Sequence, residues 1–114
     1  MKRFEVWLAN LNPQSGAEVG KVRPVLIVQS NLLNDVGHPA TIICPITTNV
    51  KPELKTLRVN LSQGEGGLSK PSAIIIDQIR AIDNKRLIEW KGEISKKSVK
   101  QVKHNLNVVL DLNW

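Results

Sequence analysis

Residues Gly16–Gln29 read GAEVGKVRPVLIVQ, a segment that joins a loop to the start of an apolar run. A glycine-bounded polar loop leads into an arginine–proline pair, and an apolar run begins at Val25. Such a run is the pattern of a buried strand. Pro24 holds Arg23 in an extended conformation and is expected at the first strand position, where its missing N–H does least harm. The stretch therefore predicts a strand that begins with a cation of restricted freedom.

The connection before this strand, residues 12–22, is longer than the roughly two to five residues that a plain hairpin needs. It carries Glu18 and Lys21, so charged side chains gather at the mouth of the strand. We interpret it as a flexible loop that adapts to a ligand, whereas the start of the strand fixes the arginine.

Other segments show the β-branched residues or the alternation of strands. Leu57, Val59 and Leu61 alternate cleanly and point one way. Pro45 lies inside its apolar run, so that strand is expected at a sheet edge or bulged around Cys44. The predicted strands are residues 5–11, 23–30, 41–47, 56–62, 72–79 and 86–94.

The tail changes period and predicts a helix over residues 95–112, with Ser95 as its N-cap. Lys96 and Lys97 then lie where the helix dipole disfavours cations. The fold class is mainly β, a small barrel closed by one C-terminal helix, in a single domain over residues 1–114. The expected buried face of the helix consists of Val99, Val102, Leu106, Val109 and Leu110.

The net charge of +6 and the isoelectric point near 9.8 favour a polyanionic partner such as RNA, DNA or an acidic peptide. A basic balance that only keeps the chain soluble fits equally well. One Phe, three Trp and no Tyr argue against a stacking platform of rings. Trp7 is expected in the core, and Trp90 and Trp114 are undecided.

Cys44 is the only cysteine, so we interpret it as a small buried hydrophobe and not as a nucleophile. His38 and His104 have no second ligand at metal spacing, so no metal site is predicted. Glu5 and Asn10 interrupt any signal-peptide core, and no apolar run has the length of a membrane span. We therefore expect a cytoplasmic protein that needs no cofactor.

Polar residues at strand ends are the candidates for chemistry. Asp77 and Gln78 follow three isoleucines, and a polar pair is costly to bury unsatisfied. An exposed face, a salt bridge or a functional site would each satisfy them, and a salt bridge from Asp77 to Arg80 is the favoured interpretation. The other candidates are Glu18, Lys21, Arg23, Thr47 and Thr48.

Three blocks in order, WLANLNPQSGAEVGKVRPVLIVQ, ATIICPITT and GLSKPSAIIIDQIRAIDNKRL, resemble the MazF/PemK family of toxin endoribonucleases. The resemblance implies an SH3-like barrel of the MazF/PemK/CcdB type that forms a homodimer. It also implies sequence-specific, metal-independent cleavage of single-stranded RNA, such as mRNA, by attack of a 2′-hydroxyl. The expected ends are a 2′,3′-cyclic phosphate or 3′-phosphate and a 5′-hydroxyl, and a cognate acidic antitoxin of the MazE/PemI kind would neutralise the protein.

The resemblance assigns catalysis to Arg23 and Thr47, with Glu18 as the loop glutamate. A guanidinium can meet two phosphate oxygens at once as charge builds on them. Some relatives carry a histidine and an arginine at positions that are Ala17 and Ile75 here, so the general base stays open between Glu18 and Asp77. Residues expected to bind RNA are Lys21, Thr48, Ser72, Asp77 and Gln78.

Two other classes of function compete with the nuclease. One is a barrel that binds RNA or an acidic peptide without cleaving it. The other is a topoisomerase poison of the related CcdB fold, which would place the key residues on the C-terminal helix. Arg23 and Thr47 on one concave surface would favour the nuclease, whereas separation onto opposite faces would favour the binding barrel.

Overall fold

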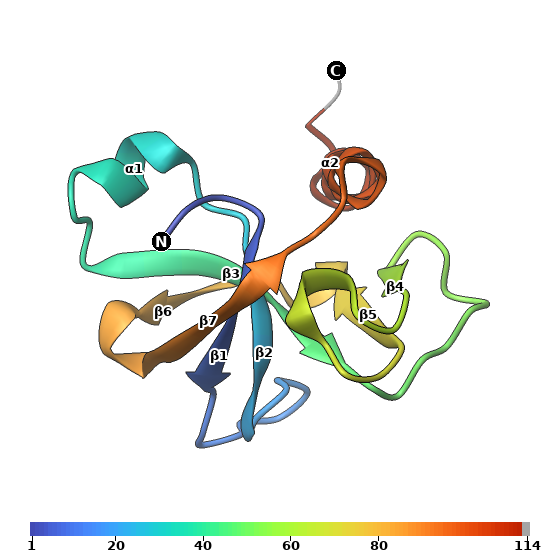
Figure 1. The fold of residues 1–114 in the computed structure, drawn as a ribbon, viewed down its shortest axis with the longest axis horizontal. Coiled ribbons are helices and arrows are strands. Elements are labelled where there is room, and N and C mark those ends of the chain that lie inside the picture. Colours follow the sequence, from blue (N-terminus) through green and yellow to red (C-terminus); the bar gives the residue numbers. More distant parts are fainter. Residues whose placement is uncertain (113–114) are drawn as a thin grey trace.

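The computed structural model describes residues 1–112, so Trp114 lies outside the described residues. It confirms a mainly β fold with a C-terminal helix (Figure 1). The strands are β1 (Glu5–Asn10), β2 (Val22–Ile27), β3 (Ala40–Thr47), β4 (Arg58–Leu61), β5 (Ser72–Ile75), β6 (Arg80–Asp83) and β7 (Leu87–Glu93). The helices are α1 (Asn31–Asp35) and α2 (Lys96–Leu110), with short 3₁₀ turns η1 (Glu65–Gly67), η2 (Ile76–Gln78) and η3 (Asn84–Arg86).

The strands form one antiparallel sheet in the order β4-β5-β3-β2-β1-β7. The long strand β3 organises it, because its first half pairs with β6 and its end pairs with β5 (Figure 1). On its other side β3 pairs with β2. Strands β2 and β3 are therefore the two central strands of this order.

The apolar run after Arg23 is buried on both of its faces. Leu26 and Val28 pack in the larger core cluster, and Val25 and Ile27 pack in the smaller one. Successive side chains of a strand point to opposite faces, so a strand between two clusters reads as a continuous apolar run. The predicted buried strand is confirmed, and it begins at Val22.

Both strand prolines lie where a ladder of hydrogen bonds stops on one side. Pro24 is the third residue of β2, not the first as expected, and β3 pairs with β2 only from Val25 onward. The expected edge or bulge at Pro45 is wrong, since β3 has partners on both sides and keeps a regular register with β2. Pro45 instead falls between Ile43, the last residue paired with β6, and Ile46, the first paired with β5.

The predicted strand over residues 72–79 ends early, at Ile75. The turn η2 follows, and the chain then forms β6, a separate strand that the periodicity did not predict. Helix α1 was not predicted either. It has five residues and none of them is buried, so it has no buried face that a periodic pattern could reveal.

The turn η1 joins the two ends of the strand order and so closes the barrel. It connects β4 to β5, yet it packs against β7 at the other end of the sheet. Gly66 and Gly67 both have positive φ, and a β-carbon at Gly67 would lie 2.0 Å from the carbonyl oxygen of Lys91.

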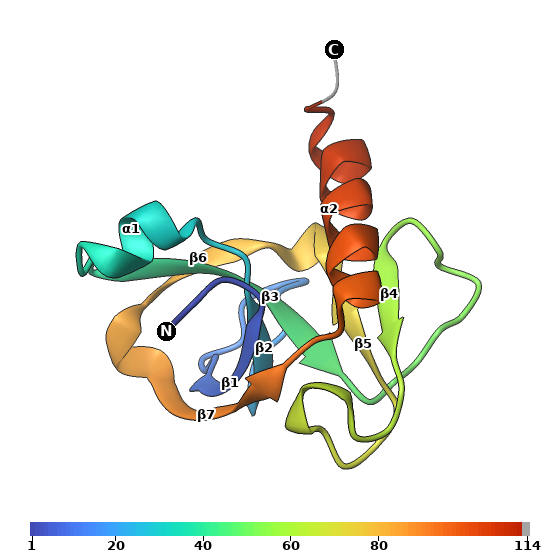
Figure 2. The same cartoon turned by 45° about the horizontal axis from the view of Figure 1, so that its top comes forward.

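Helix α2 stands beside β4 and β5 (Figure 2). Its N-cap is Ser95, as predicted, whose hydroxyl accepts a hydrogen bond from the N–H of Ser98. Val102 and Leu106 are buried in the larger core cluster, but the prediction is wrong for Leu110, which is 43% exposed. Among the described helices, none has the length and apolar character needed to cross a membrane.

Glu65 adds a second cap to α2 from the turn η1. Its carboxylate accepts hydrogen bonds from the N–H of Ser95, at 3.0 Å, and from the hydroxyl of Ser98. Partial burial pushes the pKa of Glu65 upward, but the hydrogen bonds from the serines outweigh it, so the pKa lies below its usual range. The negative charge also offsets the cost of the lysines in the first turn.

We expect Glu65→Gln to lower the free energy of unfolding at pH 7 by about 1 kcal/mol, the worth of a helix cap. A carboxyl with a lowered pKa in the folded state stabilises the fold above its unfolded pKa, about 4.3. That contribution is lost as pH falls through the folded pKa. Urea titrations from pH 7 down to pH 3 should therefore show the gap between variant and parent closing below about pH 4.3.

Glu53→Gln is the matched control, because Glu53 is an exposed carboxylate on the connection before β4. Its removal should leave the free energy of unfolding unchanged across the same titration. A gap for Glu65→Gln that stays constant down to pH 3 would contradict the role of the charge.

Candidate active site

A cleft of about 320 Å³ opens between the β1–β2 connection, the start of β2 and the end of β3. It brings together Arg23, Thr47, Glu18 and Lys21, which lie on separate segments of the sequence. Arg23 and Thr47 therefore share one concave surface, the placement expected of a nuclease. The remaining lining residues are Gln14, Ala17, Val19, Gly20, Asn49, Arg58 and Ile75.

Arg23 lies in β2, in the extended conformation predicted for a residue before proline. Its Nε donates a hydrogen bond to the carbonyl oxygen of Gly20, at 2.8 Å. No acceptor among residues 1–112 binds its two terminal nitrogens, so this edge of the guanidinium is available to a ligand. Partial burial lowers the pKa of Arg23, which strengthens it as a donor to an anion.

Thr47 is the last residue of β3 and is partly exposed. Its hydroxyl oxygen accepts a hydrogen bond from the N–H of Asn49, at 3.1 Å, so the hydroxyl hydrogen remains available to a ligand. The carbonyl oxygen of Asn49 in turn accepts a hydrogen bond from Nη1 of Arg58, at 3.4 Å. Arg58 begins β4 and brings a second guanidinium to the cleft.

Sequence reasoning missed Arg58 and Asn49. Arg58 stands on the polar side of the alternating segment 56–62, and that pattern is the one signal that marked it as exposed. Nothing in the sequence placed it beside Arg23, because β2 and β4 are separated by β3 and β5 in the sheet.

Close backbone contacts shape the connection between β1 and β2. The N–H of Lys21 donates to the side-chain oxygen of Asn12, at 2.8 Å, and the N–H of Leu11 donates to the carbonyl oxygen of Lys21, at 2.9 Å. A β-carbon at Gly20 would lie 2.6 Å from Cβ of Gln14, so this close approach requires glycine. The Lys21 side chain is exposed at the rim.

Two contacts join this connection to the segment after β5. A carboxylate oxygen of Glu18 lies 3.5 Å from Nη1 of Arg80, and Nε2 of Gln78 donates to the carbonyl oxygen of Ala17, at 3.2 Å. The favoured salt bridge between Asp77 and Arg80 is therefore wrong. The turn η2 leaves Asp77 exposed, whereas the next strand directs Arg80 toward the loop glutamate.

The structure does not bring every predicted RNA-binding residue to the cleft. Ser72 is 2% exposed and its hydroxyl donates to the carbonyl oxygen of Lys70, at 3.0 Å. Ser72 therefore does not line the cleft, because β5 is covered on both faces, and its contact with a base edge stays a prediction. Thr48 is exposed next to Thr47, and Asp77 is exposed, but neither lines the cleft.

Cys44 and the aromatic residues that the structure describes do not line the cleft. Burial and the nearby negative charge of Asp77 raise the pKa of the Cys44 thiol to about 12, so it stays protonated and is no nucleophile. Trp7 is partly buried against the smaller core cluster, as expected, and Trp90 is 54% exposed. Among residues 1–112, no three His, Cys, Asp or Glu side chains are grouped as metal ligands.

The arrangement can bind and polarise a phosphodiester. Arg23 offers two parallel N–H donors, Thr47 offers a hydroxyl, and Arg58 adds a second cation to the cleft. Preorganised donors of this kind act where charge develops during phosphoryl transfer. The competing topoisomerase-poison interpretation put the key residues on α2, which does not line this cleft.

Proteins named MazF or endoribonuclease are similar to this chain over nearly its whole length. Endoribonuclease MazF of Staphylococcus saprophyticus is 34% identical over 116 residues, covering 99% of this chain and 93% of that protein. MazF from Deinococcus radiodurans has a TM-score of 0.82 at 24% identity, covering 97% of this chain and 96% of that one. An endoribonuclease in complex with its cognate antitoxin, from a Mycobacterial species, has a TM-score of 0.81 at 19% identity, covering 100% and 98%.

The family model that matches the chain is described as PemK-like, MazF-like toxin of type II toxin-antitoxin system, and it matches residues 2–110. The match includes the three blocks on which the sequence resemblance depends. The chain therefore belongs to the family of PemK-like, MazF-like toxins of type II toxin–antitoxin systems.

Proposed function

We propose that this protein is a toxin endoribonuclease that cuts single-stranded mRNA at short sequences, without metal, and leaves 5′-hydroxyl ends. The observation that carries the proposal is the shared cleft of Arg23 and Thr47. The family and its curated relatives named Endoribonuclease MazF support the same activity. We assign it to the single domain of residues 1–114.

In the proposed reaction the ribose 2′-hydroxyl attacks the adjacent phosphorus, and the bond to the 5′-oxygen of the next nucleotide breaks. The terminal nitrogens of Arg23 stabilise the charge that builds on the non-bridging oxygens. The hydroxyl of Thr47 orients the phosphate or donates to the departing oxygen. The products are a 2′,3′-cyclic phosphate, which can open to a 3′-phosphate, and a 5′-hydroxyl.

We propose that Glu18 is the general base that removes the proton of the 2′-hydroxyl. Among the described residues that line the cleft, Glu18 is the only carboxylate. Asp77, the other candidate base, does not line it. The ion pair with Arg80 holds Glu18 at the rim, where its side chain is 49% exposed and therefore accessible to a nucleotide.

Residues around the reacting phosphate select the RNA. Lys21 binds a flanking phosphate, and Gln78 contacts a base edge. Gln78 lies next to the β1–β2 connection, because its Nε2 donates to the carbonyl oxygen of Ala17. Thr48 and Asp77 are exposed at the periphery of the site and contact nucleotides farther out. Single-stranded RNA offers such edges directly, so few aromatic side chains are required.

We further propose a homodimer in the cytoplasm that a cognate acidic antitoxin of the MazE/PemI kind neutralises. An exposed apolar groove of about 470 Å³ beside α1, β3 and α2, which includes Leu33, Ile42 and Leu110, supports the dimer. The antitoxin is supported by the similar endoribonuclease whose structure includes one. Sedimentation should show two chains per particle, and Leu110→Asp should shift the particle toward one chain.

Incubation of the purified protein with a long unstructured RNA in EDTA tests the nuclease proposal. We expect discrete fragments that polynucleotide kinase labels without prior phosphatase treatment, because their 5′ ends carry hydroxyls. RNA that is bound but stays intact would favour the non-catalytic barrel. Fragments that appear only when a divalent cation is restored would contradict the metal-independent mechanism.

A further inference from the structure

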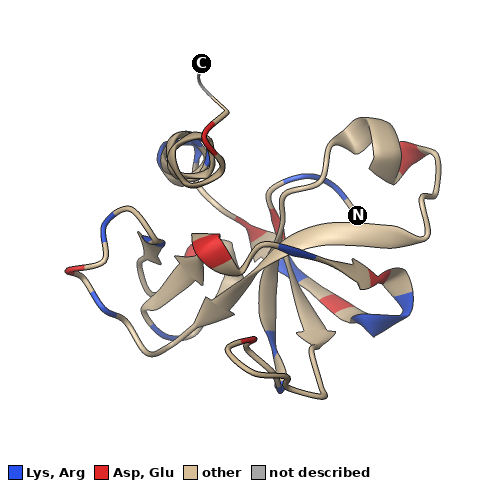
Figure 3. Ribbon diagram, turned by 180° about the vertical axis from the view of Figure 1, so that it is seen from behind, with Lys and Arg blue, Asp and Glu red and all other residues tan. Residues whose placement is uncertain are grey.

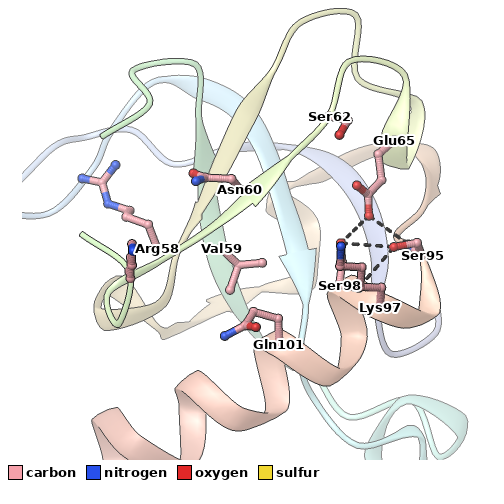
Figure 4. A pocket seen from close by; sticks show the side chains of 10 residues that line it. Arg58, Val59, Asn60, Ser62, Glu65, Ser95, Lys97, Ser98 and Gln101 are labelled. Atoms are coloured by element: carbon pink, nitrogen blue, oxygen red, sulfur yellow. Dashed lines mark hydrogen bonds between the residues drawn. The ribbon is translucent and has the colours of Figure 1, made fainter. Parts of the chain in front are cut away.

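A second cleft, of about 510 Å³, lies outside the proposed active site (Figure 4). It runs along the free edge of β4, between the turn η1 and the first turns of α2. The two clefts share one side chain, Arg58, which lines both. The two clefts therefore adjoin at Arg58.

The alternation of β4 explains why polar groups line this cleft. Val59 and Leu61 pack in the larger core cluster, so Arg58 and Asn60 point away from that core. Arg58 and Asn60 both line the cleft (Figure 4). Strand β4 is at the end of the sheet, so no further strand covers this side.

The cleft is positively charged. Lys55, Arg58 and Lys97 contribute three cations, and Glu65 contributes the one carboxylate among its described lining residues. That carboxylate already accepts hydrogen bonds from Ser95 and Ser98. It lies at one end of the cleft, away from Arg58 (Figure 4). Helix α2 carries four lysines and no acidic residue between positions 96 and 110 (Figure 3).

A buried asparagine holds two of the cation-bearing residues in place. Asn105 is 2% exposed, and its Nδ2 donates to the carbonyl oxygens of Lys55, at 3.1 Å, and Arg58, at 3.4 Å. The backbone beneath both cations is thus tied to α2, which also carries Lys97. Positioning that is completed before binding reduces the ordering cost of a ligand.

Hydrogen-bonding groups stand between the cations. Asn60 is exposed on β4, and Nε2 of Gln101 donates to the side-chain oxygen of Asn105, at 2.7 Å. Within residues 1–112 the side-chain oxygen of Gln101 has no donor and is available to a ligand. Amide groups match the donors and acceptors on base edges. No aromatic residue lines the cleft among those described, so bases would be read at their edges and not by stacking.

We propose that this cleft is a subsite for single-stranded RNA, occupied by nucleotides that flank the cleavage site. Arg58 bridges the two clefts, Lys55 and Lys97 bind phosphates of the flanking nucleotides, and Asn60 and Gln101 contact their bases. The inference rests on the proposed nuclease function and extends it, since it assigns affinity for longer RNA to a surface outside the catalytic groups.

The test compares a Lys55→Ala/Lys97→Ala double variant with a Lys85→Ala/Lys100→Ala double variant. The second pair removes the same charge from exposed positions that line neither cleft. Probes are fluorescein-labelled oligonucleotides of about 6 and about 14 nucleotides, centred on a mapped cleavage site. A 2′-deoxy group at the attacking position makes them uncleavable, and fluorescence anisotropy measures their binding across salt concentrations.

We expect the first variant to lose affinity for the long probe at least about tenfold and to bind the short probe like the parent. Its salt dependence for the long probe should flatten by about 1.4, because each lost phosphate contact contributes ~0.7 to the slope. Cleavage of a short substrate should proceed at the parent's kcat. The control variant should flatten the slope by less and keep the parent's preference for long RNA.

Equal losses in the two double variants, or equal losses for short and long probes, would overturn the subsite. If the parent cuts RNA and the first variant keeps its length preference, the subsite fails and the nuclease proposal stands. If the parent cuts no RNA, random-sequence pools of the two lengths replace the mapped probes. The same comparison then decides whether the cleft binds RNA, and the nuclease proposal alone fails.

Discussion

Replacing Arg23 with alanine should reduce kcat for RNA cleavage by about 10²–10³-fold, equivalent to about 2.7–4 kcal/mol of transition-state stabilisation. The terminal nitrogens of Arg23 are free of protein acceptors within residues 1–112, and in the proposed reaction they donate to the phosphate oxygens on which charge develops. KM should change less than kcat, because Lys21 and Arg58 still attract the RNA backbone. Single-turnover cleavage of a fluorescent substrate measures the chemical step directly.

Two further variants test whether Arg23 acts through the shape of its guanidinium group or only through its positive charge. Arg23→Lys keeps a cation but loses the planar fork, so it should recover only part of the activity. Lys85→Ala removes an exposed cation from η3 and should cleave at the parent's rate. If Arg23→Ala remains folded by circular dichroism and cleaves as fast as the parent, Arg23 has no catalytic role and the mechanism proposed here is wrong.

The largest loss of stability is expected from Gly67→Ala, more than about 4 kcal/mol, a size that few single substitutions reach. Gly67 has a φ of 74°, and an added β-carbon would lie 2.0 Å from the carbonyl oxygen of Lys91. The atom in the way is backbone, so η1 would have to move off β7 and open the barrel. Because a domain of this size is stable by about 5–15 kcal/mol, urea denaturation should show a much lower midpoint or no folded state.

Gly64→Ala is the matched comparison from the same connection. Gly64 has a φ of 91°, but nothing lies within 4 Å of an added β-carbon. It should lose only the cost of a left-handed backbone, about 1–2 kcal/mol. Equal losses in the two variants would show that the barrel tolerates the contact at Gly67 and that backbone conformation alone accounts for both.

Most elements of the fold were predictable because burial repeats at short range along the chain. The run after Pro24 and the alternation from Leu57 to Leu61 each predicted a strand, and Ser95 predicted where α2 begins. The short elements were not predictable. Helix α1 buries no residue, and β6 continues a run that reads as one strand until η2 interrupts it.

The candidate site was predictable in part, and through family resemblance more than through pattern. Arg23, Thr47 and Glu18 were named from matched motifs, and the structure brings them to one cleft. The ion pair of Glu18 with Arg80 and the burial of Ser72 were not foreseen. Both depend on which strands become neighbours, and that information is absent from local spacing.

Most of the strands, the C-terminal helix, the extended arginine before Pro24 and the family could be read from the sequence alone. Each of these follows from residues close together in the chain, where periodicity and backbone sterics act. The three-dimensional arrangement was needed to show that Arg58 lines the same cleft as Arg23 and Thr47, and that it also lines a second, basic cleft. The physical reason is that strand order and the closure at Gly67 bring together residues whose separation along the chain carries no signal.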